Sequence, residues 1–264
     1  MTTVVMKFGG ASVATPKHFH SIADVVLQRK KRFRRLVIVV SAMANTTGQL
    51  IQLANEVNTS PPSREYDMLV SVGERISISL LAMALAGKGE SAVSFTGSQS
   101  GIMTSDEHSN ARIVEMRPHR LCKVLDEEKI AIVAGFQGCS LGGEITTLGA
   151  NGSDISAVAL GVALKAVGVE FYKDVRGVYD RDPKLDDGAQ WIPELTYDKA
   201  LNIVRNGGRI LHPRCLELAK QNGLPLSILS FHKPDTPGTR IVDPSVMPVD
   251  KPCYETCLSE PIHN

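Results

Sequence analysis

Six short apolar runs alternate along this chain with segments of helical periodicity, and this alternation restricts the fold more than any other feature. Continuous apolar strands separated by helices are typical of a largely parallel sheet that helices cover on both faces. We therefore predict an α/β fold. Strands are predicted at residues 3–8, 36–40, 92–95, 130–135, 169–172 and 226–229, and helices at residues 18–28, 76–86, 155–167 and 197–206.

Composition adds few constraints. The 264 residues are 43% hydrophobic and 22% charged, which is ordinary for a globular protein, and a formal net charge of +1 gives no reason to expect nucleic acid or a membrane as a partner. The basic run at residues 29–35 is either a nucleic-acid patch or the charged C-terminus of a helix. Because an apolar run follows directly, we favour the helix C-terminus. The longest uncharged apolar stretch, residues 76–87, is too short to span a bilayer.

The five cysteines indicate the compartment. Their odd number, the absence of disulfide-like spacing and the lack of a signal peptide predict reduced thiols and a cytoplasmic protein. Cys253 and Cys257 are spaced as a pair of metal ligands, but no second pair completes a site. We therefore predict no metal site made of protein side chains.

Candidate chemistry begins where the first predicted strand ends, in the segment Lys-Phe-Gly-Gly-Ala-Ser at residues 7–12. Adjacent glycines let the backbone approach an anion closely, and the start of a following helix supplies free N–H groups. Lys7 adds a charge that can neutralise phosphoryl oxygens. The segment is not a P-loop, because the P-loop spacing and its trailing Lys-Ser/Thr are missing. Taken alone, it is a weak signal, because a Gly-Gly segment after a strand is usually just a turn.

Two later segments carry similar groups. Residues 143–154 lead into an apolar helix, and Ser153 or Asp154 could be its N-cap. Residues 173–184 place a strand-end aspartate, an aromatic ring, turn residues and a cation within a dozen positions. Each of these features also has an explanation as ordinary loop structure.

The order of the motifs is more specific than any one of them. The series KFGG, SAMANTT, SVGER, GFQG, GEITTLG followed by GSD, KDVRGVY followed by DPK, and ILHP resembles the aspartate kinases of the amino-acid kinase family, over residues 3–242. The resemblance implies a three-layer αβα sandwich around a mainly parallel eight-stranded sheet. It also implies a single domain over residues 1–264, with an acceptor lobe at about residues 1–150 and a nucleotide lobe at about residues 151–264.

The reaction implied by the resemblance is transfer of the γ-phosphoryl group of ATP to the β-carboxylate of L-aspartate, a step in amino-acid biosynthesis. A carboxylate is already an anionic nucleophile at neutral pH, so that no general base is required. ATP and Mg²⁺ are the implied cofactors, with Mg²⁺ held mostly by ATP oxygens and water. We expect ATP and a small-molecule acceptor as ligands, and a homo-oligomer.

The resemblance also implies roles for individual residues. Glu74 would receive the amino group of the acceptor, and Asp154 would organise Lys7 and the reacting phosphate. The implied site consists of Lys7 and Asp154 as catalytic residues, Gly9, Gly10, Ser12 and Ser153 as phosphate-binding residues, Ser41, Thr47, Glu74 and Ala150 at the acceptor, and Lys173, Asp174, Tyr179, Lys184 and Arg209 at the nucleotide.

Four positions depart from the family pattern. The largest departure is Ala150, which stands where aspartate kinases carry an arginine that clasps the α-carboxylate of the substrate. An arginine–carboxylate pair contributes on the order of 1.5–3 kcal/mol, which alanine cannot replace. Ala11 replaces a hydroxyl residue, Lys173 replaces a threonine, and Arg209 replaces a lysine with the charge kept but the geometry changed.

Three hypotheses follow. The chain is an aspartate kinase with a weakened grip on the α-carboxylate, a kinase of the same chemistry acting on a related amino or dicarboxylic acid, or a non-catalytic regulatory paralogue. The retained phosphate-binding residues argue against the third. Since the chain reaches only Asn264, shortly beyond the kinase motifs, we also expect the ACT domains of typical aspartate kinases to be absent.

Overall fold

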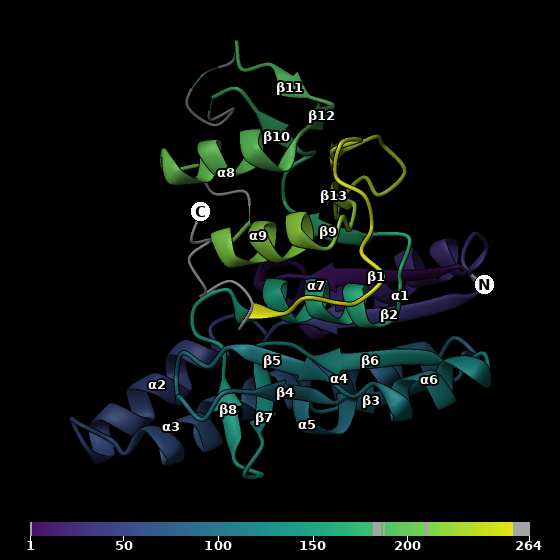
Figure 1. Cartoon of the computed structure of the whole chain (residues 1–264). Helices are drawn as coiled ribbons and strands as arrows, with labels where there is room; N and C mark the ends of the chain where they lie inside the picture. Colours follow the sequence, from purple (N-terminus) through teal and green to yellow (C-terminus); the bar gives the residue numbers. More distant parts are fainter. Residues whose placement is uncertain (1, 182–185, 187, 209–210, 256–264) are drawn as a thin grey trace.

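An eight-stranded sheet forms the centre of the molecule (Figure 1). The computed structural model describes residues 2–181, 186, 188–208 and 211–255. Strands β13 and β14 are antiparallel, and the other neighbouring pairs run parallel, so that the predicted mainly parallel sheet is confirmed. In spatial order the strands are β12 (Glu194–Leu195), β14 (Thr239–Ile241), β13 (Leu226–Ser230), β9 (Val169–Lys173), β1 (Thr3–Phe8), β2 (Arg35–Val40), β6 (Ile130–Ala134) and β3 (Ala92–Phe95).

This strand order separates the two halves of the chain. Strands β1, β2, β6 and β3 all come before residue 135, whereas β9, β13, β14 and β12 all come after residue 168. The two sets meet where β1 pairs with β9, from Val5 opposite Val169 to Phe8 opposite Tyr172. The carboxyl ends of these two strands therefore lie side by side.

Helices cover both faces of the sheet. Successive residues of a strand point to opposite faces, and here the residues on both faces are apolar and need to be buried. Val5 and Val37 belong to one hydrophobic core, while Met6 and Ile38 belong to the other. Each of these side chains is fully buried and contributes about 1.5–3 kcal/mol to folding. One core contains α1 (Pro16–Lys30) and α4 (Val72–Ala86), and the other contains α6 (His119–Asp126), α7 (Gly152–Ala163), α8 (Tyr197–Arg205) and α9 (Pro213–Gln221), which confirms the three-layer αβα sandwich.

A second sheet of four short strands was not predicted. Its order is β5 (Ile113–Met116), β4 (Ile102–Thr104), β7 (Gln137–Ser140) and β8 (Ile145–Thr147). The remaining elements are η1 (Gly10–Val13), α2 (Thr46–Val57), α3 (Ser63–Val70), α5 (Gly97–Ser100), and the paired strands β10 (Val178–Tyr179) and β11 (Trp191–Ile192).

The predicted helix over residues 155–167 is displaced. Helix α7 begins three residues earlier, at Gly152, and ends at Ala163. It ends there because Lys165 has a positive φ of 48° and the N–H of Val167 donates to the carbonyl of Thr3 in β1. The other three predicted helices correspond to α1, α4 and α8.

The basic run at residues 29–35 begins at the C-terminus of a helix, as expected, but it continues through a turn to Arg35, the first residue of β2. Helix α1 ends at Lys30, and four cations of the run pair with acidic side chains of neighbouring elements. The pairs are Arg29 with Glu170, Lys30 with Glu90, Arg34 with Glu128, and Arg35 with Asp126. Most of the positive charge of the run is therefore paired within the fold.

The stretch Ser63–Ala86, which contains α3 and α4, is long and apolar enough to cross a membrane by length and composition alone. This stretch is longer than the uncharged residues 76–87, because α3 continues almost directly into α4 and charged residues such as Asp67 and Glu74 are included. Helix α4 packs against α1, β3 and β6, and its Leu81 and Leu85 are fully buried. Its apolar character is accounted for by this position inside the sandwich.

Candidate active site

Lys7 and Asp154 form an ion pair at the end of the central strands. Nζ of Lys7 lies 2.5 Å from Oδ1 of Asp154, and the two side chains are 10% and 5% exposed. Lys7 is near the carboxyl end of β1, and Asp154 lies in the first turn of α7, where the helix dipole favours a negative charge. The structure thus brings together the two residues expected to be catalytic.

The Gly-Gly turn lies beside this pair. A Cβ added to Gly9 would be 3.4 Å from Nζ of Lys7, and one added to Gly10 would be 4.0 Å from the carbonyl oxygen of Ala42. The helix that follows is only the short η1, and the long helix α1 begins at Pro16. Ser12 is buried, with its hydroxyl 3.5 Å from the carbonyl oxygen of Tyr172, so that it lies against the backbone of β9.

Ser153 is held close to the end of another central strand. It is 5% exposed, and a Cβ added to Gly135 would lie only 2.6 Å from the Cβ of Ser153. Glycine at position 135 therefore lets the start of α7 approach β6. The N-cap of α7 is Asn151, with a φ of 57°, so the interpretation of Ser153 or Asp154 as an N-cap was wrong.

Ser41, Thr47 and Glu74 come from three elements that meet around Ala42. Ser41 directly follows β2, Thr47 lies in the first turn of α2, and Glu74 lies in the first turn of α4. A Cβ added to Gly73 would be 2.8 Å from the Cβ of Ala42 and 3.7 Å from Oγ1 of Thr47. The start of α4 is therefore pressed against the segment that carries the other two residues.

Glu74 is a buried carboxyl group whose hydrogen bonding is incomplete. Glu74 is only 3% exposed, and its Oε1 accepts a hydrogen bond from the N–H of Ala42 at 3.0 Å. Oε2 is buried and has no hydrogen-bond partner among the described residues. Burial raises the pKa of Glu74 to about 7, although backbone N–H groups and the charge of Lys7 act in the opposite direction. A cationic group beside Oε2 would satisfy this carboxylate.

The residues expected at the nucleotide follow β9. Lys173 is the last residue of β9, and burial lowers its pKa; the negative charge of Asp154 raises it, and the nearby charge of Lys7 lowers it further. Lys7, Asp154 and Lys173 therefore form one group of interacting charges. Asp174 is exposed and Tyr179 is half-buried on β10. Lys184 and Arg209 lie outside the described residues, as does Cys257.

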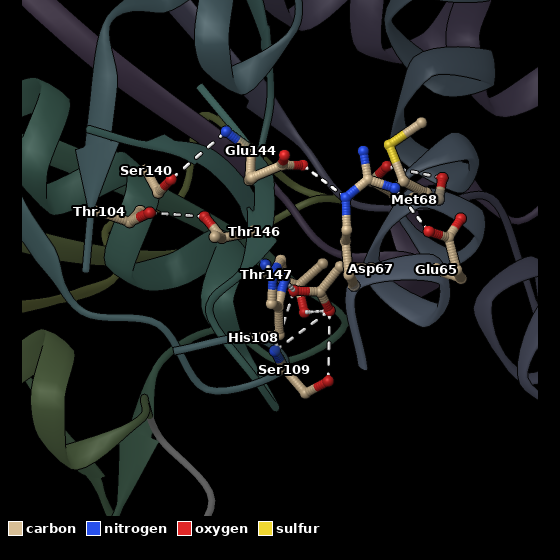
Figure 2. Close-up of polar contacts among 12 residues, drawn as sticks. Glu65, Asp67, Met68, Thr104, His108, Ser109, Ser140, Glu144, Thr146 and Thr147 are labelled. Atoms are coloured by element: carbon tan, nitrogen blue, oxygen red, sulfur yellow. Dashed lines mark hydrogen bonds and ion pairs between the residues drawn. The ribbon is translucent and has the colours of Figure 1, made fainter. Parts of the chain in front are cut away.

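Asp67 is a residue that the sequence analysis missed (Figure 2). This fully buried carboxylate on α3 accepts hydrogen bonds from Nδ1 of His108 at 2.9 Å, from the N–H and hydroxyl of Ser109 at 2.9 and 3.3 Å, and from the N–H and hydroxyl of Thr147 at 3.0 and 2.7 Å. It therefore joins α3 to two separate segments. A single acidic residue amid the apolar side chains of residues 66–70 was the available signal.

The segment that Asp67 holds leads directly to Ala150. Gly149 has a φ of 78°, and a Cβ added to it would be 3.2 Å from both the carbonyl oxygen of Ser109 and Oδ1 of Asn110. Ala150 itself is exposed in the turn before α7. The family pattern has an arginine at this position. The methyl side chain of Ala150 therefore leaves the start of α7 without that cation.

Within the described part of the chain, no group of three or more His, Cys, Asp or Glu side chains could hold a metal ion. The four described cysteines are not joined in disulfides. Among the described residues, Lys7 and Lys173 are the groups of the candidate site that can bind an anion, and its carboxyl groups are not clustered as metal ligands.

Comparison with known proteins places the chain among kinases. The profile of the amino acid kinase family matches residues 2–230. The chain is similar to the aspartokinases of Bacillus sp. (strain MGA3), with 46% identity over 230 residues, and of Mycolicibacterium smegmatis, with 41% identity over 265 residues. These matches cover 87% and 100% of this chain but only 56% and 62% of the two relatives. The chain therefore spans little more than half the length of the curated relatives it matches.

Solved structures agree. The aspartate kinase from Synechocystis superposes with a TM-score of 0.83 at 42% identity, covering 95% of this chain and 40% of that one. The E. coli aspartokinase III in complex with aspartate and ADP superposes with a TM-score of 0.79 at 27% identity, covering 91% of this chain and 64% of that one. The chain is thus similar to these kinases in both sequence and fold.

Proposed function

Because the chain belongs to the amino acid kinase family, we propose that it transfers the γ-phosphoryl group of ATP to the β-carboxylate of L-aspartate, giving 4-phospho-L-aspartate. Relatives with 41–46% identity that are aspartokinases support this reaction, as does the related structure with aspartate and ADP bound. The proposed setting is amino-acid biosynthesis in the cytoplasm.

The observation that carries the proposal is the incomplete hydrogen bonding of Glu74. A buried carboxylate with a free oxygen is costly unless a ligand pairs with it. Oε2 of Glu74 is such an atom among the described residues, and it lies near the Lys7 charge that lowers the pKa of this group. An acceptor with a protonated amino group would provide the missing partner. Glu74 therefore favours an amino acid as the acceptor, with Ser41 and Thr47 beside it.

The proposed chemistry is neutralisation of charge between two anions. The acceptor carboxylate attacks the γ-phosphorus, the bond from that phosphorus to the β,γ-bridging oxygen breaks, and ADP leaves with the electron pair. Lys7 stabilises the charge that develops on the phosphoryl oxygens, and Asp154 fixes its ammonium group by the 2.5 Å ion pair. Gly9, Gly10 and Ser153 leave room for the phosphate, and Ser12 supports the strand beside it.

The nucleotide is proposed to bind in the half of the chain after about residue 150, and the acceptor in the half before it, both within one domain. Lys173 would add a second cation at the phosphates, while Asp174 and Tyr179 would contact ribose and adenine. Lys184 and Arg209 would contribute further cations.

Mg²⁺ fits this site as an ion held by ATP oxygens and water, because the described residues provide no set of three acidic ligands. It would supply charge neutralisation at the phosphates.

A homo-oligomer is also proposed, and an apolar stripe on α4 supports it. Val72, Ile76 and Met83 are 37%, 41% and 67% exposed, and Met68 of α3 extends the stripe with 39% exposure. Exposed apolar side chains aligned along one helical face are typical of protein interfaces. Light scattering of the purified protein at several concentrations would decide this point.

Ala150 favours a second candidate, the same reaction on a related amino or dicarboxylic acid. An acceptor whose α-carboxylate is absent, masked or bound elsewhere would not need the arginine that this position lacks. The reaction and the donor are unchanged in this candidate, and only the acceptor differs.

The decisive experiment measures ADP release with aspartate, aspartate α-amide, N-acylated aspartates and other dicarboxylic acids, with and without Mg²⁺. Aspartate as the best acceptor supports the first candidate, and another acid as the best acceptor supports the second. ADP release with none of them would favour a non-catalytic paralogue and overturn the proposed function.

A further inference from the structure

Arg214 on α9 uses every one of its side-chain donors inside the protein. Nε donates to Oε1 of Glu255 at 2.5 Å, and Nη2 donates to Oε2 of Glu255 at 3.0 Å and to the carbonyl of Ala111 at 2.8 Å. Nη1 donates to the carbonyl of Leu148 at 2.8 Å and to Oδ1 of Asn110 at 3.3 Å. A guanidinium group has five N–H donors, and all five are accounted for. Arg214 therefore has no donor left for a substrate.

Glu255 completes the same arrangement from the last part of the described chain. Its side chain is fully buried, and besides the two bonds from Arg214 it accepts the N–H of Ile113 in β5 at 2.8 Å. Two parallel hydrogen bonds between a guanidinium and a carboxylate are the strongest form of ion pair. Glu255 comes well after the last kinase motif in the sequence. It is bound to the second half of the chain through α9 and to the first half through β5.

The groups that Arg214 holds are the two segments that border Ala150. The carbonyl of Leu148 is two residues before Ala150, and Asn110 lies against Gly149. Asp67 holds these same segments at Ser109 and Thr147. The turn before α7 is therefore fixed from one side by α3 and from the other by α9.

We propose that Arg214 and Glu255 are positioning residues that set the acceptor-side turn at residues 148–150, and through it the binding of the acceptor. The proposal rests on the proposed function for its kinetic part, since it concerns the acceptor of that reaction. Arg214 acts through the backbone carbonyl of Leu148 and through Asn110, and Glu255 keeps the guanidinium in place.

A kinetic difference between the two substrates is expected to reveal this role. A displacement of about 1 Å in a positioning group costs about 10²-fold in kcat/KM for the affected substrate. Variants of the pair are expected to lower kcat/KM for the acceptor about 10- to 100-fold, mainly through KM, while KM for ATP changes by less than about twofold. A residue that only stabilises the fold would not separate the two substrates in this way.

The test uses the full chain with Arg214→Lys, Glu255→Gln and the apolar double variant Arg214→Met/Glu255→Leu. The double variant leaves no buried charge unpaired, so that it is expected to fold. The matched control is Arg205→Lys and Glu217→Gln, which alter an exposed Arg–Glu pair between α8 and α9. Kinetics are measured for ATP and for the best acceptor of the screen.

Hydrogen exchange provides a readout that does not depend on activity. The N–H groups of Ala111 and Leu148 donate to the carbonyls of Thr147 and Phe136, so their exchange reports the order of both segments. In the double variant these amides are expected to exchange at least about tenfold faster, with β1 and β2 unchanged. Unchanged exchange would overturn the proposal whatever the activity, and so would equal losses for ATP and acceptor. An inactive parent would overturn the proposed function, and exchange alone would then decide the role of Arg214 and Glu255.

Discussion

The ammonium group of Lys7 and the carboxylate of Asp154 lie 2.5 Å apart, where the end of β1 meets the start of α7. Both side chains are nearly buried, so each is the main counter-charge of the other within a region of low dielectric. Lys173 is a further positive charge that interacts with Asp154. The pair therefore links the stability of the sandwich to the presence of a cation at the phosphate site.

Lys7→Ala is expected to lower kcat by at least about 10²-fold, because a preorganised charge is lost from the transition state of phosphoryl transfer. It should also destabilise the fold by about 1–3 kcal/mol, since Asp154 loses its 2.5 Å ion pair and keeps only its interaction with Lys173. Steady-state kinetics and urea unfolding measure the two effects. Lys88→Ala is the control, because Lys88 pairs with an exposed Asp24. Normal turnover in Lys7→Ala would remove Lys7 from the mechanism.

Glu74→Gln is expected to stabilise the protein at high pH. The folded pKa of Glu74 is raised to about 7 from 4.5, so the folded state favours the protonated form. The stabilisation that Glu74 contributes to the parent protein is therefore fully present below about pH 4.5, and it is lost as pH rises through 7. A neutral glutamine avoids the loss, which amounts to roughly 3 kcal/mol above pH 8. Urea unfolding at pH 5 and pH 8 measures it, and an equal effect at both values would show that Glu74 is ionised throughout.

Ala150→Arg tests which acceptor the pocket fits. If the acceptor is aspartate, the new arginine should lower its KM by about tenfold or more with little change in kcat, because the bond is made equally in the ground and transition states. If the pocket is shaped for another acid, the variant should obstruct that acid and help aspartate little. Glu74→Gln is the comparison, since it should weaken any acceptor that has an amino group. Unchanged kinetics for every acceptor would show that residue 150 does not face the substrate.

Asp67→Asn is expected to cost about 3 kcal/mol or more of unfolding free energy. Asparagine replaces one accepting oxygen by an amide donor, which then opposes the N–H and hydroxyl groups of Ser109 and Thr147. Glu65→Gln on the same helix is the control, because the Glu65 side chain is 62% exposed and its change should stay within about 0.5 kcal/mol. Thermal and urea unfolding measure both. A small effect in Asp67→Asn would mean that the loops keep their places without this carboxylate.

Six of the eight strands of the central sheet could be predicted because they read as continuous apolar runs, whereas β12 and β14 were missed because they are only two and three residues long. Strands β1 and β3 begin and end at the predicted residues. The small sheet could not be predicted in this way, since β7 and β8 contain Gln137, Ser140, Thr146 and Thr147 and are only three or four residues long. Short polar strands form because neighbouring elements position them, and the local sequence pattern does not indicate such strands.

The same difference applies to the site. The ordered motifs placed Lys7, Asp154 and Glu74 in one site, and the structure brings their charges together. Asp67, Arg214 and Glu255 were missed, because their importance comes from partners in distant segments. The family pattern also carried Lys184 and Arg209 into the site, and these remain predictions outside the described residues.

The seam between β1 and β9 bears on how the two substrates meet. Each half of the chain contributes its own block of strands, and within the sheet the blocks join along the parallel ladder from Val5–Val169 to Phe8–Tyr172. Lys7 and Lys173 lie at the end of that ladder, one on each side. In the proposed arrangement, with the nucleotide on one block and the acceptor on the other, this backbone ladder connects the two binding regions directly. The distance between donor and acceptor would then depend on hydrogen bonds inside the sheet and not on a loose linker.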